Sequence, residues 1–396
     1  MATQPRRLLF LISRFLDGGI DTVLVEYLRH LSLSPAYQLT LAIGSDMGTM
    51  EVFRDALPSQ VAVVHLVSSP LLAWGPKARA AKRMRPITKV ADELMMTPLR
   101  RAVTRRKLDK LVSEHDVIVD FDCCFSSYLD SVAKTKVAFF HFTFALIQEQ
   151  DARRMRRLAK RLQRYDHVVL LSKAIEAEGK RLYPELASKF TVIYNPKDPA
   201  RLRQQAAEAV DNALIGQPYI LAVERLTEPK DMPTLLRAFA LLRNQHGHGE
   251  LKLVVIGKGE QMQQLQQLAR DLALADSVVF MGFVANPYPW VAACQLMVFS
   301  SKSEGLGMSL VEAMLLDRPI VATDCPTGPR EVLADGKAGL LTPVGDAQAM
   351  ADAMHRMLTD DALRQQQAEG RREQAQLFTF DTADRQLSAI FGINHD

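Results

Sequence analysis

Two glutamates around a glycine turn are the residues whose spacing most clearly suggests chemistry. Glu304 comes shortly after an apolar run that ends at Phe299, and Glu312 lies eight residues further along, inside an expected helix. A fully helical path would separate them by about 12 Å, and a turn shortens that path. The span suits the two ends of one nucleotide sugar, whose hydroxyls donate hydrogen bonds to carboxylates. The alternative is that Glu312 only caps or solvates its helix.

The residues between these glutamates predict a phosphate site. Gly305 and Gly307 let the backbone approach a ligand closely, and Leu306 stands between them. Exposed amides at the start of the following helix, together with the helix dipole, favour a pyrophosphate. We therefore expect these three residues to bind the donor diphosphate, with one of the two glutamates at the sugar and the other at the ribose.

Two cations follow an earlier apolar strand. Arg225 and Lys230 come just after the run Tyr219–Val223, at the carboxyl end of that expected strand. Positive charge there can neutralise a departing nucleotide diphosphate, which is the main electrostatic demand of glycosyl transfer. We therefore expect that no metal ion and no cofactor is required.

The elements around these residues predict two doubly wound, Rossmann-like α/β domains. Short apolar runs alternate with amphipathic stretches from the start of the chain, and the alternation restarts at Tyr219, as in βαβ units around parallel sheets. We expect the active site in a cleft that the domains face. The predicted parts are 1–198, an acceptor-binding domain; 199–217, a linker; 218–376, a nucleotide-sugar-binding domain; and 377–396, a helix returning to the first domain.

The segment Glu304–Glu312 resembles the donor-site signature of the family-4 retaining glycosyltransferases, which have the GT-B fold. Glu224–Asp231 is similar to the segment that opens the family's second domain, and Gly257 to its next strand-end turn. Residues 325–331, with the sequence CPTGPRE, resemble the version in bacterial surface-polysaccharide and lipid-linked oligosaccharide enzymes. By this resemblance, the arginine and lysine described above grip the donor pyrophosphate.

Residues of the first domain extend the resemblance. Gly18 and Gly19, after Asp17, look like the family's glycine-rich loop. His141 matches its acceptor-side histidine, and Asn195 the asparagine after its last first-domain strand. The implied catalytic residues are His141, Arg225, Lys230 and Glu304. The implied donor-binding residues are Gly18, Gly19, Asn195, Gly257, Gly305, Leu306, Gly307 and Glu312.

The sequence departs from the family pattern in two places. Glu224 stands where the family often has glycine, and His141 lies among phenylalanines instead of beside a polar neighbour. A further pair, Asp120 and Asp122, matches the manganese-binding carboxylates of the other major glycosyltransferase fold. Because this pair lies in the first domain, away from the donor residues, we interpret it as a strand end and predict no metal site.

Composition predicts a reduced, cytoplasmic chain. The four cysteines show neither metal-ligand spacing nor a convincing disulfide framework. The longest late apolar stretch, Val137–Ile147, is about half the length that crosses a bilayer. Membrane contact is therefore expected to be peripheral, on the inner face of the cytoplasmic membrane. Residues 1–200 carry 31 Lys and Arg against 21 Asp and Glu, whereas the rest carry 18 against 24, so an anionic lipid or phosphorylated acceptor suits the basic half.

Two segments are dominated by basic residues. One runs from Lys77 to Lys110. In the other, Met155, Leu158 and Leu162 form a helical stripe among cations that are predicted to contact the membrane or acceptor: Arg153, Arg154, Arg156, Arg157, Lys160, Arg161 and Arg164. The equal alternative is that the stripe packs on the sheet and the cations are solvated. Without zinc spacing, a helix-turn-helix pattern or an aromatic-rich ribonucleoprotein-type strand, nucleic acid is not an expected partner.

The resemblance implies a metal-independent retaining hexosyl- or N-acetylhexosaminyltransferase. The expected donor is a UDP-sugar, with GDP-mannose next. The expected acceptor is lipid-linked or a saccharide, in bacterial cell-surface polysaccharide or glycolipid synthesis. The alternatives are a sugar-nucleotide 2-epimerase and a non-catalytic membrane-associated scaffold. The base, sugar, acceptor, linkage and oligomeric state stay open, because they depend on pocket shape.

Overall fold

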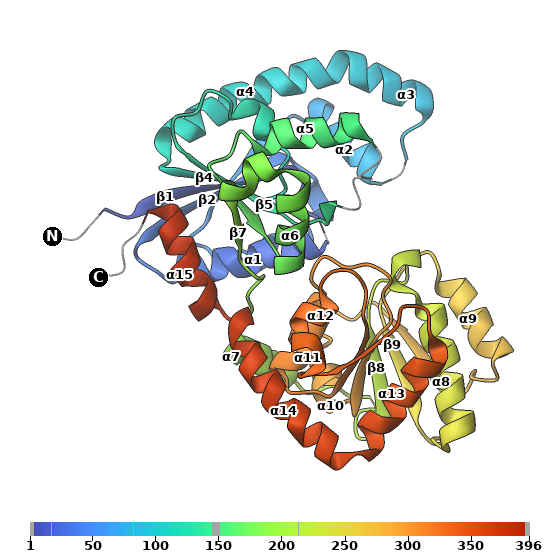
Figure 1. Cartoon of the computed structure of the whole chain (residues 1–396). Helices are drawn as coiled ribbons and strands as arrows, with labels where there is room; N and C mark the ends of the chain where they lie inside the picture. The colour runs from blue at the N-terminus through green and yellow to red at the C-terminus, as the bar shows by residue number, and fades with distance from the viewer. Residues whose placement is uncertain (1–3, 17, 82, 145–150, 213, 393–396) are drawn as a thin grey trace. The chain divides into compact units, whose positions relative to one another are not determined.

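A computed structural model describes residues 4–16, 18–81, 83–144, 151–212 and 214–392 (Figure 1). Asp17 and the end of the stretch Val137–Ile147 lie outside these residues. The chain divides into two compact units: residues 1–171, 176–196 and 384–396 form unit 1, and residues 172–175 and 197–383 form unit 2. Each unit is built around its own parallel sheet.

The sheet of unit 1 has seven strands in the order β3-β2-β1-β4-β5-β6-β7. The strand order reverses between β1 and β4, where an open α/β sheet offers a ligand crevice at the carboxyl ends of its strands. All its pairings are parallel. The strands are β1 (Arg6–Ile12), β2 (Tyr37–Ser45), β3 (Ala62–Val67), β4 (Val117–Asp120), β5 (Thr135–Phe140), β6 (His167–Leu170) and β7 (Phe190–Val192).

Helices cover this sheet because its central strands are apolar on both faces. Residues 8–12 of β1 are at most 1% exposed, and the four residues of β4 are buried. The helices that carry residues of unit 1 are α1 (Gly19–Ser32), α2 (Pro70–Ala80), α3 (Pro86–Ala91), α4 (Thr97–Glu114), α5 (Ala152–Leu162) and α6 (Lys173–Leu182), with the end of α15 (Phe380–Phe391).

The sheet of unit 2 has six strands in the order β10-β9-β8-β11-β12-β13, and its order reverses between β8 and β11. Its strands are β8 (Tyr219–Val223), β9 (Lys252–Ile256), β10 (Val278–Gly282), β11 (Leu296–Phe299), β12 (Ile320–Thr323) and β13 (Leu340–Thr342). Its helices include α7 (Pro199–Ala206), α8 (Met232–His246), α9 (Met262–Asp271), α10 (Tyr288–Ala293), α11 (Met308–Leu315), α12 (Pro329–Val332), α13 (Ala347–Thr359) and α14 (Asp361–Ala375).

The prediction of two doubly wound α/β domains is confirmed. The unit boundaries differ from the expected parts in three places. Helix α7 falls within the expected linker but belongs to unit 2. Residues 377–383, expected in the returning helix, also belong to unit 2. Residues 172–175 do so as well, because the amides of Lys173 and Ala174 donate to the Glu331 carboxylate at 2.7 and 3.2 Å. Among the described residues, no helix is both long and apolar enough to span a bilayer.

Candidate active site

Lys230 and two carboxylates form a compact charged group at the point where the sheet of unit 2 reverses its order. The ammonium Nζ lies 2.5 Å from Glu224 Oε2 and 2.5 Å from Glu304 Oε1. Glu224 directly follows β8 and Glu304 lies in the loop after β11, so the lysine joins the two strand ends that flank the crevice. All three side chains are at least 87% buried. Nζ also lies 5.2 Å from the centre of the Phe299 ring, within cation–π range.

The backbone around Lys230 is fixed by contacts between the same two loops. Lys230 ends a short 3₁₀ turn, and Asp231 then adopts a left-handed conformation at φ 44° before α8 begins. Ser300 Oγ donates to the Lys230 carbonyl at 2.9 Å, and the Lys302 amide donates to the Pro229 carbonyl at 2.8 Å. The lysine is therefore held by backbone contacts as well as by its ion pairs.

Burial and charge shift the acid–base properties of this group. Burial raises the pKa of Glu224 to about 7, although the Lys230 ammonium opposes the rise and Glu304 adds to it. For Lys230, burial favours the neutral form, but Glu224 and Glu304 outweigh it and raise the pKa above its ordinary value. The lysine therefore stays a cation at neutral pH, while Glu224 titrates there.

Glycines let the strand-end turns of unit 2 pack against each other. A Cβ at Gly257 would lie 1.8 Å from the Glu224 carbonyl oxygen, and its φ of +147° also favours glycine. Gly307 caps α11 at φ +87°. Leu306 is 3% exposed, and a Cβ at Gly328 would lie 2.6 Å from its carbonyl oxygen. The Thr327 hydroxyl also bonds the Glu304 carbonyl, so the Glu304–Gly307 turn is packed on one side by the loop after β12.

Glu312 lies on α11 in a second polar group. Lys197 Nζ lies 2.9 Å from Glu312 Oε1, and the Tyr288 hydroxyl donates to the same oxygen at 3.1 Å. Lys197 is 94% buried and Glu312 85% buried by side chain. The glutamate therefore neither caps α11 nor lies free in solvent, and both of these contacts use the same carboxylate oxygen.

In unit 1, the corresponding reversal point between β1 and β4 is occupied by hydrogen bonds within the protein. Asp120, at the end of β4 and fully buried, accepts from the amides of Cys124 and Phe125 at 3.1 and 2.7 Å, and from the Tyr165 hydroxyl at 2.5 Å. Asp122 accepts from the amide and the hydroxyl of Ser13 at 2.9 and 2.5 Å. This is the strand-end role expected for the pair.

His141 follows β5 and lines a pocket of about 300 Å³. Burial lowers the pKa of the imidazole to about 4, against a hydrogen bond with the Phe121 backbone, so the ring is neutral at physiological pH. Among the described residues, none forms a hydrogen bond with its Nε2. The other lining residues are Asp122, Cys123, Phe139, Phe140, Phe142, Leu158 and Arg161.

The remaining site residues predicted in unit 1 lie at the carboxyl ends of two strands. Gly18 precedes α1, and its amide donates to Asp21 at 2.9 Å. A Cβ at Gly19 would meet nothing within 4 Å, so packing does not explain this glycine. Asn195, three residues after β7, is 3% exposed, and none of the described residues hydrogen-bonds its Oδ1.

Comparisons with known proteins agree with this architecture. The solved structure of HepE from Anabaena in complex with UDP is similar with a TM-score of 0.77 and 20% identity, covering 98% of this chain and 99% of that one. The lipopolysaccharide outer core galactosyltransferase WaaB in its apo form is similar with a TM-score of 0.68 and 18% identity, covering 98% and 99%. The chain has the GT-B fold.

A family model and curated sequence relatives each match less than half of this GT-B chain. Residues 217–360 match a family model described as "Glycosyl transferases group 1". N-acetylgalactosamine-N,N'-diacetylbacillosaminyl-diphospho-undecaprenol 4-alpha-N-acetylgalactosaminyltransferase of Campylobacter jejuni is 34% identical over 44% of this chain and 46% of its own length. Lipopolysaccharide core biosynthesis glycosyltransferase LpsE of Rhizobium meliloti is 33% identical over 41% and 46%. The chain thus spans about half the length of these curated relatives.

The GT-B structure brings only some of the predicted catalytic residues together among the described contacts. Lys230 and Glu304 touch, whereas Arg225 is exposed at the end of β8. Sequence reasoning missed Glu224 as the second carboxylate on Lys230, and also Ser309, whose hydroxyl donates to Glu224 at 2.9 Å. The one feature of the sequence that could have pointed to Glu224 was its position, where the family often has glycine. The roles assigned to all these residues stay predictions.

The basic helix α5 packs its apolar stripe against the protein. Leu158 and Leu162 are 7% and 0% exposed, while the cations from Arg153 to Arg161 face solvent. Arg164 lies beyond the helix and pairs with Asp130 at 2.8 Å. The apolar stripe therefore packs on the protein, as the alternative interpretation expected. Only the positive charges of α5 remain available to an anionic surface.

One group of potential metal ligands occurs among the described residues: Asp46, Glu51 and His65, with ligand atoms within 4.8 Å of one another. Glu51 Oε1 already lies 2.9 Å from His65 Nε2 and accepts from the Met47 amide at 2.8 Å. Asp46 accepts from the Gly48 amide at 2.8 Å. These bonds account for the geometry without an ion.

Proposed function

We propose that this chain is a glycosyltransferase that moves a sugar from a nucleotide-diphosphate sugar to a lipid-linked or saccharide acceptor in bacterial cell-surface polysaccharide or glycolipid synthesis. The observation that carries the proposal is the buried cation Lys230, held between Glu224 and Glu304 at the reversal point of a sheet that matches the group 1 glycosyl transferases. A UDP-sugar is the favoured donor and GDP-mannose the next. The UDP complex of the similar HepE structure supports the first choice.

The proposed reaction breaks the bond between the anomeric carbon and a phosphate oxygen and forms one to the acceptor hydroxyl oxygen on the same face. Configuration is then retained, and the departing phosphate takes the acceptor proton. Lys230 and Arg225 offset the charge that develops on the diphosphate, with the amides at the start of α11. These groups supply the positive charge, so the reaction is proposed to need no metal ion.

The carboxylates have separate proposed roles. Glu304 positions Lys230 through the ion pair described above and accepts a hydrogen bond from a sugar hydroxyl. Glu312, steadied by Lys197 and Tyr288, presents its remaining oxygen to the ribose. His141, neutral at physiological pH, contacts the acceptor side of the reaction as an uncharged hydrogen-bonding group. The basic face of α5 is proposed to hold the chain electrostatically at the inner face of the cytoplasmic membrane.

Calorimetric titration of UDP, GDP and ADP in the presence of a chelator tests the donor site. We expect UDP to bind most tightly and Glu312→Ala to weaken it on the order of tenfold, because a charged acceptor of two ribose hydrogen bonds is lost. Glu228→Ala, at an exposed glutamate paired with Lys302, is the matched control and should bind like wild type. If no nucleotide bound to the folded protein, the transferase proposal would fail and the non-catalytic scaffold would replace it.

A further inference from the structure

Exposed large apolar side chains are concentrated in one short segment of unit 1. Of the thirteen exposed large apolar side chains among the described residues, seven lie between residues 71 and 99. Their exposed fractions run from 50% for Leu99 to 83% for Ile87. The seven are Leu71, Trp74, Ile87, Val90, Leu94, Met95 and Leu99. Scattered apolar residues are ordinary on a protein surface, but such a concentration indicates a surface that is covered in use.

A continuous helical backbone presents most of these side chains. Helix α3 leads through a π turn at Asp92–Met96 into α4, and the junction residues Ala91 and Thr97 keep right-handed helical angles. No residue of α3 is buried. Ile87, Val90 and Leu94 recur at helical spacing, so they form a stripe on one side of this helix, and each of them is more than half exposed.

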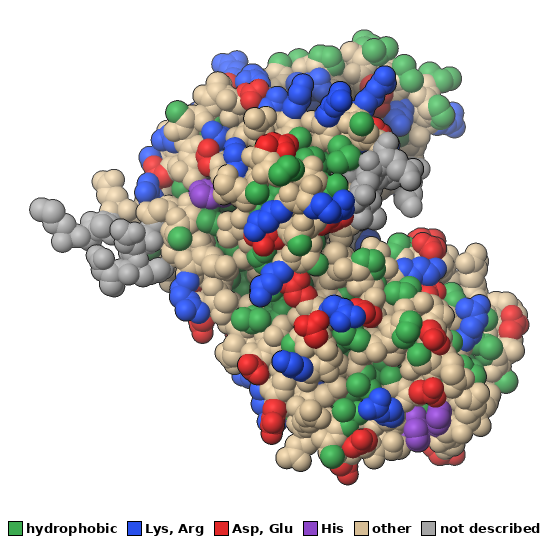
Figure 2. Space-filling model, viewed as in Figure 1, with side chains coloured by type: hydrophobic (Ala, Val, Ile, Leu, Met, Phe, Trp, Pro, Cys, Tyr) green, Lys and Arg blue, Asp and Glu red, His purple; other side chains and the backbone are tan. Residues whose placement is uncertain are grey.

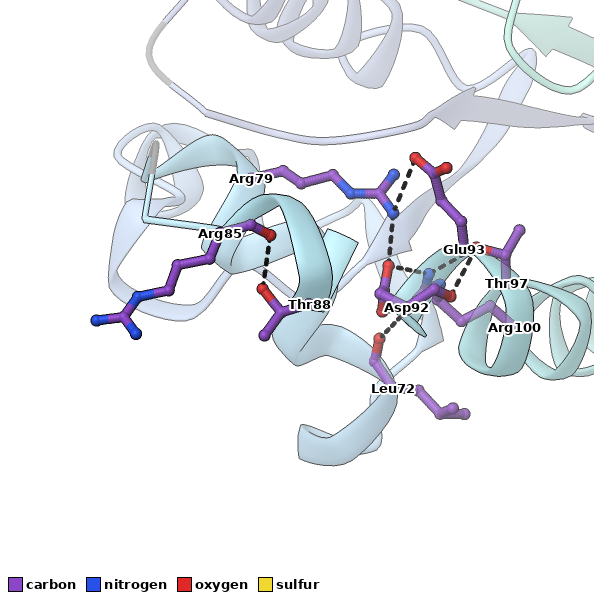
Figure 3. Close-up of polar contacts among 8 residues, drawn as sticks. All are labelled: Leu72, Arg79, Arg85, Thr88, Asp92, Glu93, Thr97 and Arg100. Atoms are coloured by element: carbon purple, nitrogen blue, oxygen red, sulfur yellow. Dashed lines mark hydrogen bonds and ion pairs between the residues drawn. The ribbon is translucent and has the colours of Figure 1, made fainter. Parts of the chain in front are cut away.

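Helix α2 and the continuous helix of α3, the π turn and α4 form a helical hairpin. Charged side chains lie on its inside. Asp92 is 4% exposed and accepts two hydrogen bonds from Arg100, at 2.7 and 2.6 Å, and one from Arg79 at 2.5 Å (Figure 3). A Cβ at Gly75 would lie 2.2 Å from the Asp92 carboxylate, so α2 approaches it only through glycine. Bonds from Arg100 lower the pKa of Asp92 despite its burial, which keeps it ionised. The charges are thus paired inside while the large apolar side chains point outward.

An apolar hollow of about 220 Å³ lies at this hairpin. Its walls come from α2 on one side and from α3 and the π turn on the other. Only Thr88 and the paired carboxylate of Asp92 contribute polar side chains to it. The apolar lining residues are Leu71, Trp74, Ala91, Met95 and Met96.

Positive charge surrounds the apolar residues. Figure 2 shows green apolar side chains over α3 next to a row of blue Lys and Arg side chains over α4. In Figure 3 the Arg85 side chain points away from the Asp92 group, toward solvent. The exposed cations of α3, α4 and the loop before α3 are Arg83, Arg85, Lys89, Arg101, Arg105, Arg106 and Lys110, opposed by the exposed Glu93, Asp109 and Glu114.

We infer that the surface formed by α2, α3, the π turn and the start of α4 inserts into the headgroup region of an anionic phospholipid bilayer. The apolar side chains enter the acyl boundary, an acyl chain segment occupies the hollow, and the surrounding cations bind lipid phosphates. Tryptophan is enriched at such interfaces, because its ring is apolar and its N–H is polar. This surface differs from α5, whose apolar stripe is already buried, and its insertion does not depend on the proposed sugar transfer.

Trp74 provides the direct test. The chain has two tryptophans, and Trp290 is 2% exposed in unit 2, whereas Trp74 is 51% exposed. Adding vesicles of phosphatidylglycerol and phosphatidylcholine to the full chain should shift its emission to the blue, and brominated acyl chains should quench it. Phosphatidylcholine alone should give a much smaller effect. An unshifted, unquenched emission with anionic vesicles at low salt would overturn the inference.

A pair of double variants separates insertion from charge attraction. Ile87→Ser/Leu94→Ser should reduce vesicle binding on the order of tenfold, because buried apolar area is lost. Leu33→Ser/Val52→Ser removes side chains that are 79% and 58% exposed elsewhere in unit 1 and should bind like wild type. Equal vesicle binding by wild type and both double variants would overturn the inference. Concentration-dependent dimerisation that Ile87→Ser/Leu94→Ser abolishes would also overturn it, because the surface would then bind a second copy of the chain. UDP titration of each variant keeps the two proposals apart. A protein that binds UDP but not vesicles contradicts only the membrane inference, and one that binds vesicles but not UDP contradicts only the proposed function.

Discussion

The two sheets reverse their strand order in the same way, yet the chain builds opposite chemistry at the two reversal points. Between β1 and β4, Asp120 and Asp122 accept hydrogen bonds from the backbone and hydroxyl groups of their own unit. Between β8 and β11, Lys230 is shared by Glu224 and Glu304. Topology therefore decides where a crevice forms, and the side chains decide whether carboxylates there accept hydrogen bonds from the backbone or pair with a buried cation.

The largest expected effect is at Lys230. Lys230→Met should lower the release of UDP from a UDP-sugar at least about 100-fold, because the buried cation beside the departing diphosphate is lost. Lys302→Met is the control, since this half-exposed lysine pairs with Glu228 in the neighbouring loop and should stay within about twofold of wild type. Steady-state rates measured with thermal unfolding curves separate lost chemistry from lost folding. Equal rates for Lys230→Met and Lys302→Met would show that the buried cation at the reversal point of unit 2 has no special role in the reaction.

The next effect is one of stability in unit 1. Asp120→Asn replaces one of the two acceptor oxygens by an amide donor that faces either the Cys124 or the Phe125 amide, so the free energy of unfolding should fall by about 2 kcal/mol. Asp130→Asn, at a largely exposed aspartate paired with Arg164, should change it by less than about 1 kcal/mol. Urea denaturation followed by circular dichroism measures both. If Asp120→Asn left stability intact and abolished UDP binding instead, Asp120 would belong to the ligand site.

The smallest effect concerns pH. The pKa of Glu224 is raised to about 7 in the folded protein, so an ionised Glu224 disfavours folding above that value, and protonation relieves the penalty as the pH falls toward 4.5. A bound diphosphate disfavours the same negative charge. UDP affinity should therefore rise a few-fold from pH 8 to pH 6, with proton uptake visible as a buffer-dependent binding enthalpy.

Glu224→Gln provides the control for this pH dependence, because it keeps the hydrogen bond from Ser309 and removes the titrating charge. The variant should bind UDP with an affinity that hardly changes over that range. A wild-type affinity that stayed constant between pH 6 and pH 8 would contradict the proposal that the diphosphate binds at Lys230, beside Glu224.

Periodicity predicted most elements because central strands and amphipathic helices carry strong local patterns. Strand β8 coincides with the apolar run Tyr219–Val223, and β11 ends at Phe299, as the second run predicted. Strand β3 was not predicted: it pairs only with β2 at the sheet edge, and four of its six residues are partly or fully exposed, so its pattern is weak.

Tertiary partners explain what the sequence could not predict about the site. Glu304 was recognised from its motif, but its ion pair with Lys230 joins loops after two different strands. The partner of Glu312 is Lys197, which precedes the second sheet altogether. The stripe of α5 illustrates the same limit, since a basic amphipathic pattern is compatible with a face turned either inward or outward. Only the packing of Leu158 and Leu162 decides between them.

The fit of Gly257 against the Glu224 carbonyl limits how the crevice at the end of this sheet can move. The Glu224 amide donates to Ile256, the Leu226 amide to Lys258 and the Gly257 amide to Gly282, so the turns after β8, β9 and β10 are linked through their main chains. No side chain can enter between the first two of these turns. This wall of the crevice is therefore rigid, and if the proposed donor binds here, adaptation to its shape falls to the side chains and to the Glu304–Gly307 loop.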